Sequence, residues 1–119
     1  MTADQETRLR QITETLVERV HPEKIVLFGS QAAGQERVDS DSDVDLLVIL
    51  ESDLRRDRRQ ELVSRALRPR RFPVDILAYT PSEVADCAAS PDSFITHILR
   101  TGRVLYDRQS GRVADARAG

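Results

Sequence analysis

Apolar residues recur every three or four positions in the first part of the chain. Residues 4–20 predict an amphipathic helix, because their apolar side chains fall on one stripe: Leu9, Ile12, Leu16 and Val20. The helix is expected to end at His21-Pro22, since the residue before a proline is disfavoured in the helical conformation.

Short apolar runs that are too brief for helices predict buried strands at three places: Lys24–Phe28, Val44–Leu50 and Phe72–Tyr79. A fourth, shorter strand is expected at Arg103–Tyr106. The second run is apolar on both faces except where it begins, which is typical of a strand covered on both sides.

Helices are expected between these strands. Gly29-Ser30 breaks the first strand, and residues 31–33 are expected to form a short helix that closes at Gly34. Asp53 is expected to cap a helix that runs to about Leu67. Its predicted inner face consists of five residues: Leu54, Leu62, Val63, Ala66 and Leu67.

Two further helices are predicted to begin at Thr80-Pro81-Ser82-Glu83 and at Ser90-Pro91-Asp92-Ser93. Gly102 is expected to end the second of them. The buried face predicted for this last helix consists of Phe94, Ile95, Ile98 and Leu99.

The order of these elements predicts an α/β (α+β) fold with a small sheet flanked by helices. A chain of 119 residues is long enough for one domain, and no internal repeat or linker divides it. We expect a single domain over residues 1–107 and a flexible C-terminal tail over 108–119, where few residues can be buried.

Composition narrows the class of protein. The single cysteine, Cys87, excludes an intramolecular disulfide framework. No apolar run is long enough to cross a bilayer, and Met1 to Arg10 lacks the apolar core of a signal peptide, so a cytoplasmic protein is expected. The net charge of −2 argues against general nucleic-acid binding, and no direct nucleic-acid partner is expected.

The charges are nevertheless unevenly distributed. Aspartates alternate over residues 39–45, whereas eight arginines lie within residues 55–71. An acidic cluster followed by a basic stretch indicates a site for a metal and an anion. The basic stretch itself has two open interpretations: a solvated helix face, partly paired with Asp57 and Glu61, or a docking surface for an acidic partner, RNA or nucleotide phosphates.

Three aspartates are candidate metal ligands. Asp43 and Asp45 are two positions apart, so on a strand they point to the same face. Asp75 lies in another apolar strand, where an isolated carboxylate is costly to bury. If the two strands pair, three carboxylates converge, and each close pair repels by about 4 kcal/mol unless protons or divalent cations relieve the repulsion. Mg²⁺, or Mn²⁺, suits such oxygen ligands.

Alternatives remain for these acids. Asp41 and Asp43 also fit an acid-x-acid pattern, but Asp45 leads directly into the apolar strand, so the pair Asp43 and Asp45 is preferred. The aspartate run also fits a solvated turn, and Asp75 also fits an edge strand that faces water.

Gly29-Ser30 is the candidate phosphate-binding turn. It follows a predicted buried strand, glycine allows close approach of the backbone, and the serine hydroxyl and nearby N–H groups can donate to phosphate oxygens.

Together these segments resemble the minimal nucleotidyltransferase (MNT) branch of the DNA polymerase β superfamily. The matching residues are Gly29-Ser30-Gln-Ala-Ala-Gly34, Asp43-Val-Asp45-Leu-Leu-Val48, Val74-Asp75-Ile-Leu77 and Ile98–Tyr106. The resemblance implies the nucleotidyltransferase fold, Mg²⁺ and ATP. It further implies that Asp43, Asp45 and Asp75 bind metal, that Asp75 also assists deprotonation of the attacking hydroxyl, and that Gly29 and Ser30 bind the nucleotide.

Small members of this branch are often antitoxins paired with HEPN-type ribonuclease toxins. The resemblance implies an antitoxin that transfers AMP from ATP to a tyrosine hydroxyl of such a toxin. The chain has Ala33 where family members commonly have arginine. The alternative is therefore a weakly active or inactive binding module that neutralises its partner by occlusion, and transfer to a small molecule or a nucleic-acid end is a third possibility.

Overall fold

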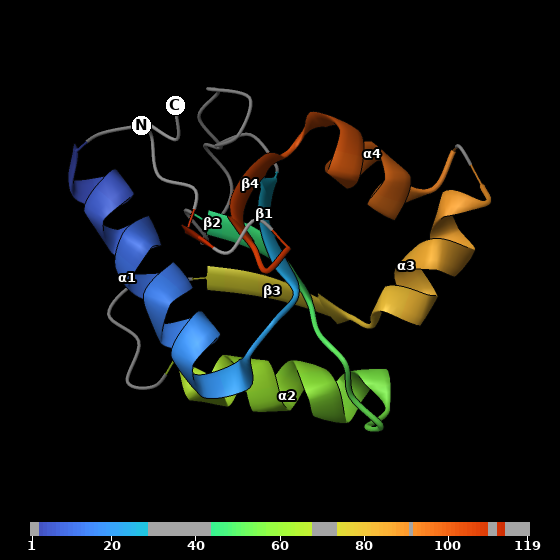
Figure 1. The fold of residues 1–119 in the computed structure, drawn as a ribbon, viewed down its shortest axis with the longest axis horizontal. Coiled ribbons are helices and arrows are strands. Elements are labelled where there is room, and N and C mark those ends of the chain that lie inside the picture. The colour runs from blue at the N-terminus through green and yellow to red at the C-terminus, as the bar shows by residue number, and fades with distance from the viewer. Residues whose placement is uncertain (1–2, 29–43, 68–73, 91, 110–111, 114–119) are drawn as a thin grey trace.

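The computed structural model describes residues 3–28, 44–67, 74–90, 92–109 and 112–113 (Figure 1). They form a mixed α/β fold, as the pattern of apolar residues predicts. The elements in chain order are α1 (Ala3–Val20), β1 (Lys24–Phe28), β2 (Val44–Ile49), α2 (Arg56–Ala66), β3 (Val74–Tyr79), α3 (Pro81–Ala88), α4 (Phe94–Thr101), β4 (Arg103–Asp107) and β5 (Arg112–Val113). The short helix expected over residues 31–34 lies outside the described residues.

The strands form one sheet in the order β3-β2-β1-β4-β5. Three of its four pairings are antiparallel, and β2 and β3 are parallel. A parallel pair needs a long crossover connection, and α2 lies within this one.

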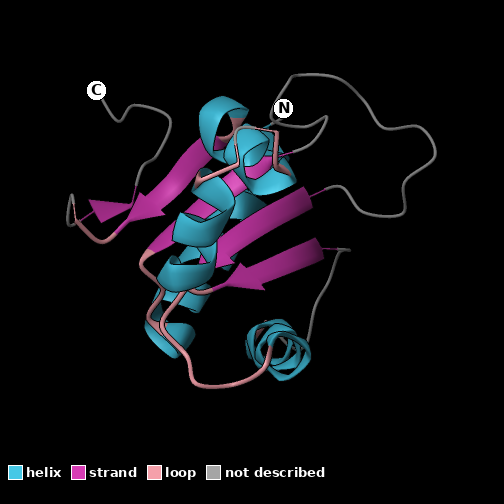
Figure 2. Ribbon diagram, turned by 90° about the vertical axis from the view of Figure 1, so that its right-hand side faces the viewer, coloured by secondary structure: helices cyan, strands magenta, loops and turns pink. Residues whose placement is uncertain are grey.

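Helices cover both faces of the sheet, and each face has its own apolar cluster. One cluster joins the sheet to α1 and α2, and the other joins it to α3 and α4. Figure 1 shows the two pairs of helices on different sides of the strands, and Figure 2 shows α3 and α4 in front of them. On β2, Leu46 and Val48 belong to the first cluster, whereas Leu47 and Ile49 belong to the second. This alternation accounts for the nearly unbroken apolar run of that strand.

The first helix ends where the proline predicts, at Val20. His21 follows with a φ of 51°, the left-handed conformation that commonly terminates helices. Near the N-terminal end of α1, the Glu6 carboxylate accepts two hydrogen bonds from Arg103 of β4, at 2.8 and 3.0 Å. These bonds hold the pKa of Glu6 below its ordinary value and tie α1 to the sheet.

Helix α2 differs from the expectation in its start and in its inner face. It begins at Arg56, and the preceding Arg55 makes no side-chain cap, so the predicted cap at Asp53 is wrong. Ser52 Oγ instead accepts a hydrogen bond from the backbone N–H of Leu54. Leu54 and Leu62 are 45% and 47% exposed and do not belong to the inner face.

The buried stripe of α2 is narrow, because the helix lies beside the outermost strand, β3 (Figure 2). It consists of Arg59 and Val63, spaced four apart, and continues four residues further to the buried Leu67, directly after the last helical residue. A helix at the margin of a sheet buries a narrower stripe than one lying across its centre, so two of the predicted leucines face outward.

Helices α3 and α4 begin where the sequence predicts. The Thr80 side chain accepts a hydrogen bond from the Glu83 backbone, and Glu83 accepts one from the Thr80 backbone, forming a complete capping box. Ser93 caps α4 by accepting a hydrogen bond from the backbone of Thr96. Each start therefore follows from local side-chain hydrogen bonding.

The buried face of α4 consists of Ile95 and Ile98, with Leu99 partly buried. The prediction that Phe94 is buried is wrong, because its side chain is 58% exposed. Phe94 is the first residue of α4 and meets Phe28, the last residue of β1. It therefore lies where the sheet ends and only part of its ring is covered.

Gly102 ends α4 as predicted, but the reason is close packing and not an unusual backbone conformation. Its φ is −77°, which any residue can adopt. A Cβ at this position would lie 2.5 Å from Val26 Cγ1, 2.7 Å from the Ile98 carbonyl oxygen and 2.8 Å from that of Leu27. Two of these neighbours are backbone atoms, which cannot move aside without shifting β1 or α4.

Replacement of Gly102 by alanine is expected to lower the free energy of unfolding by about 2–3 kcal/mol, because the added methyl group overpacks the junction of α4 and β1. Urea unfolding followed by circular dichroism measures the change. Arg100→Ala, an exposed substitution on the same helix, should change it by less than about 0.5 kcal/mol. A Gly102→Ala protein as stable as the Arg100→Ala protein would contradict the close packing.

Regular structure continues beyond the expected domain boundary at residue 107. Arg112–Val113 forms β5, which pairs with β4, so part of the segment expected to be a tail belongs to the sheet. Residues 114–119 lie outside the described residues. None of the helices that the structure describes has the length and apolar character required to span a membrane.

Candidate active site

Two of the three predicted acidic ligands lie side by side on neighbouring strands. Asp45 of β2 pairs with Asp75 of β3 in the parallel register. Strands alternate their side chains, so both acids share the sheet face that carries Leu47 and Leu77, which is the face covered by α3 and α4. Adjacent strands are about 4.8 Å apart, which brings the two carboxylates close together. The pairing of these two strands, on which the expected convergence of the acids depends, is therefore present.

The two acids differ in burial. Asp45 is 5% exposed and is the one buried acidic residue among those that the structure describes, whereas Asp75 is exposed on the outermost strand. A buried carboxylate requires a hydrogen-bond donor or a cation to offset its lost hydration. The exposed position of Asp75 allows it to reach a molecule that arrives from solvent.

The remaining predicted site residues, Gly29, Ser30 and Asp43, lie outside the described residues, as does Ala33. Their roles stay predictions. In the chain, Gly29 follows the last residue of β1, and Asp43 precedes the first residue of β2.

The donor set fits a hard cation such as Mg²⁺. Asp45 and Asp75 supply carboxylate oxygens from adjacent strands, and Mg²⁺ typically takes one or two carboxylates together with substrate phosphates. No group of three or more metal-ligating side chains occurs among the residues with described positions. The pair therefore needs Asp43, or phosphate oxygens of a nucleotide, to complete a metal site.

Helix α2 supports the strand that carries Asp75. The Gln60 side-chain oxygen accepts a hydrogen bond from the backbone N–H of Ala78, an N–H group that points away from β2. An edge strand otherwise leaves such groups to solvent. Arg56 packs over the Tyr79 ring, 4.5 Å from its centroid. Both contacts hold β3 against α2 and thereby fix the position of Asp75.

A buried ion pair joins α2 to α3. The Arg59 side chain is 2% exposed, and its Nη2 lies 2.9 Å from Oε1 and 3.0 Å from Oε2 of Glu83. Within the described part of the chain, Arg59 Nε is buried and has no hydrogen-bond partner. The helical spacing of the sequence indicates this burial, since Arg59 precedes the apolar Val63 by four residues and Leu67 by eight. The neighbouring arginines, however, suggest a solvated face at the same positions.

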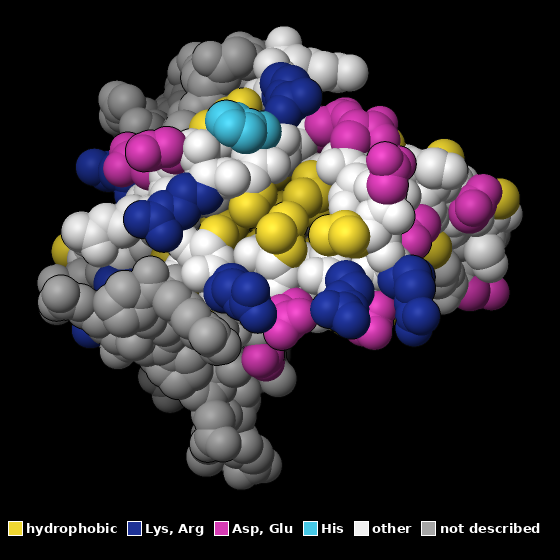
Figure 3. Space-filling view, turned by 90° about the horizontal axis from the view of Figure 1, so that it is seen from below, with side chains coloured by type: hydrophobic (Ala, Val, Ile, Leu, Met, Phe, Trp, Pro, Cys, Tyr) yellow, Lys and Arg dark blue, Asp and Glu magenta, His cyan; other side chains and the backbone are white. Residues whose placement is uncertain are grey.

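The solvated interpretation holds for most of the arginines of this stretch that the structure describes. Arg55, Arg58 and Arg65 are exposed. The expected partners are present, with Asp57 at 3.6 Å from Arg55 and Glu61 at 3.2 Å from Arg65. Figure 3, seen from the α2 side, shows acidic and basic side chains interspersed around an apolar area. This mixture favours neither RNA nor phosphate as the ligand of that face.

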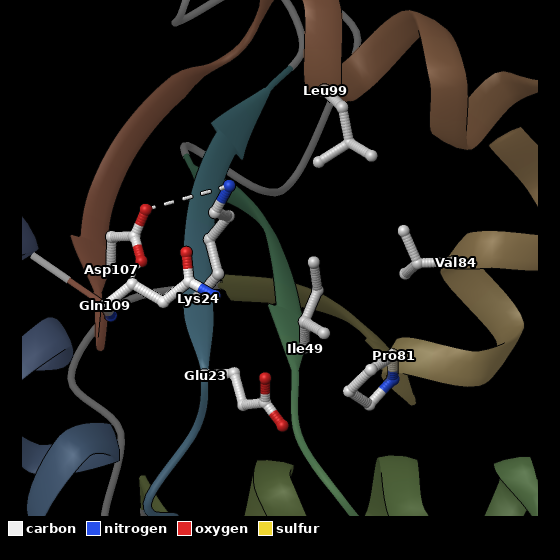
Figure 4. Close-up of a pocket in the computed structure, with 8 residues that line it drawn as sticks. All are labelled: Glu23, Lys24, Ile49, Pro81, Val84, Leu99, Asp107 and Gln109. Carbon is white, nitrogen blue, oxygen red and sulfur yellow. Dashed lines mark hydrogen bonds and ion pairs between the residues drawn. The ribbon is translucent and has the colours of Figure 1, made fainter.

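A separate hollow of about 220 Å³ lies at the other end of the same sheet face (Figure 4). Lys24 and Asp107, 3.8 Å apart, form part of one wall, and Ile49, Val84 and Leu99 form the apolar wall. Ile49 is four residues beyond Asp45 on β2, a distance of about 13 Å along the strand. This hollow is therefore distinct from the acidic pair.

Comparisons with known proteins agree with the fold. The family described as "Polymerase beta, Nucleotidyltransferase" matches residues 10–111. A crystal structure of a protein from Sulfolobus solfataricus, itself proposed to be a nucleotidyltransferase, has a TM-score of 0.60 and 22% sequence identity, with 92% of this chain and 90% of that chain covered.

A second crystal structure, of another proposed nucleotidyltransferase, has a TM-score of 0.47 and 21% identity, covering 69% of this chain and 88% of that chain. No curated protein matches the chain in sequence. The structural likeness rests on the first of these two neighbours and concerns the fold. Because the family match spans most of the sequence, including β2 and β3, the chain belongs to the polymerase β nucleotidyltransferase family.

Proposed function

We propose that this nucleotidyltransferase is a Mg²⁺-dependent antitoxin that transfers AMP from ATP to a tyrosine hydroxyl of a HEPN-type ribonuclease toxin in the cytoplasm. The observation that carries the proposal is the register of Asp45 with Asp75, which brings two carboxylates to one face of the sheet. The resemblance of the sequence motifs to MNT antitoxins supports the toxin as the acceptor.

Each acidic residue has a separate task in the proposed reaction. Asp45, with Asp43, holds the metal, which when bound neutralises charge on the nucleotide phosphates and orients them. Ser30 donates a hydrogen bond to a phosphate oxygen. Asp75, which the family pattern also assigns to the metal, accepts the proton of the acceptor hydroxyl, for which its exposed position on β3 is suited.

The transfer step is an in-line displacement. The acceptor oxygen forms a bond to the α-phosphorus of ATP, and the bond from that phosphorus to the oxygen bridging to the β-phosphorus breaks. The hydroxyl proton passes to the Asp75 carboxylate, and pyrophosphate leaves with the bonding electrons. The products are the adenylylated tyrosine and pyrophosphate.

The test uses a HEPN-type toxin whose reading frame neighbours that of this chain. The purified pair is incubated with Mg²⁺ and with ATP that carries a label on either the α- or the γ-phosphate. Label from the α-phosphate should appear on the toxin, label from the γ-phosphate should not, and peptide mass analysis should place AMP on tyrosine. Modification should require the divalent cation and stop when it is chelated.

A different outcome would favour the second candidate, a binding module, for which the specific observation is Ala33 in place of the common arginine. In that case the chain would bind the toxin and inhibit its ribonuclease activity without ATP, and no label would be transferred.

A further inference from the structure

Phe94 is unusually exposed for an aromatic residue of a small domain. Its side chain is 58% exposed, the largest value among the large apolar residues that the structure describes as exposed. Its ring meets Phe28 edge to face, with centroids 5.7 Å apart and ring planes at 85°. The contact holds the ring of Phe94 in place and leaves much of its surface open.

This aromatic pair adjoins the two acids. Phe28 pairs directly with Asp45 across β1 and β2, just as Asp45 pairs with Asp75 across β2 and β3. Phe28 also packs against the apolar cluster of the α3/α4 face. The side chains of Phe28, Asp45 and Asp75 therefore share that face. Phe94 adjoins this row through its ring contact with Phe28.

We propose that Phe94 is the platform on which the base of the bound nucleotide stacks. This inference rests on the proposed function and adds to it the position of the nucleotide base. Gly29 and Ser30, the expected phosphate-binding residues, directly follow Phe28 in the chain, whereas the expected proton acceptor, Asp75, is at the far end of the row. The nucleotide therefore belongs to the Phe28 side and the acceptor to the Asp75 side.

The other described aromatic rings are less suited to this role. The Tyr79 ring is covered by the Arg56 guanidinium, and Tyr106 packs against the cluster beneath α1. Stacking on an aromatic ring tolerates any base, because every base has a π-face. We therefore expect ATP and GTP to bind with affinities that differ by only a few fold.

Calorimetric titration in the presence of Mg²⁺ tests the platform without relying on turnover. ATP is compared with inorganic tripolyphosphate, which has the phosphates but no base. Phe94→Ala should weaken ATP binding by about tenfold, within the range measured for stacking of a base on an aromatic side chain, and leave tripolyphosphate binding unchanged. Phe94→Trp, which retains a stacking surface, should restore the affinity for ATP.

Leu62→Ala is the matched control, because Leu62 is a similarly exposed apolar residue on α2. It should bind both ligands as the unaltered chain does, and circular dichroism should show the same fold for all variants. Equal affinity of the Phe94→Ala and unaltered chains for ATP would overturn the platform and leave the proposed function standing. Absence of Mg²⁺-dependent ATP binding by the unaltered chain would overturn both.

Discussion

Replacement of Asp45 by asparagine is expected to reduce nucleotidyl transfer by at least about a hundredfold while the fold is retained. Asparagine has nearly the same shape but removes the charge that would hold the cation, and even indirect metal partners commonly contribute ten- to a hundredfold. Transfer of α-labelled phosphate to the toxin measures activity. Mg²⁺ with ATP should raise the melting temperature of the unaltered chain and have a much smaller effect on the variant.

Two further variants distinguish a loss of transfer activity specific to the acidic pair from a general effect of replacing an aspartate. Asp75→Asn should also lose transfer but should retain more of the binding of Mg²⁺ and ATP, because Asp75 is assigned mainly to the acceptor. Asp53→Asn removes an exposed aspartate that makes no helix cap and should leave transfer unchanged. Normal transfer by Asp45→Asn would refute the assignment of the acidic pair.

Replacement of Glu83 by alanine is expected to lower the free energy of unfolding by about 3 kcal/mol. The change leaves the buried Arg59 guanidinium without its counter-charge, and breaking such a pair from one side typically costs 3–5 kcal/mol. The lower end is expected because the Glu83 side chain is 34% exposed. The same change removes the Glu83 half of the capping box at Thr80. Urea unfolding followed by circular dichroism measures the loss.

Helix α2 offers a matched control for this prediction. Glu61 pairs with Arg65 on the same helix, but both side chains are more than half exposed. Glu61→Ala should therefore cost only about 0.5 kcal/mol. The double variant Arg59→Met with Glu83→Gln should be more stable than Glu83→Ala, because no buried charge remains unpaired. Equal losses for Glu61→Ala and Glu83→Ala would show that burial of Arg59 adds nothing.

Local chemistry accounts for the features of the fold that could be predicted. Pro22 limits α1, Thr80 with Glu83 begins α3, and Ser93 begins α4, since each acts through atoms only a few residues away. The strands follow from short apolar runs, and the two-residue period assigns Asp75 to the opposite face from Ile76. Such signals depend on neighbours in the chain and are readable without a structure.

Only the tertiary structure decided which surfaces meet. The position of α2 beside β3 exposes Leu54 and Leu62 and buries Arg59, although the sequence marks all three as members of one helical region. Phe94 is exposed for a similar reason, because it lies where the sheet ends. Apolar character indicates that a residue can be buried, whereas the position of its helix or strand determines whether a neighbouring element covers it.

For the candidate site as well, the sequence identified the residues and the tertiary structure decided how they are arranged. The sequence by itself identified Asp45 and Asp75 as acids in apolar strands, and the resemblance to a family assigned them a role. That β2 and β3 are parallel neighbours, with these two residues in register, is a property of the assembled sheet. Strand order and register depend on contacts between residues about 30 positions apart, which local periodicity does not encode, so only the folded chain brings the two carboxylates together.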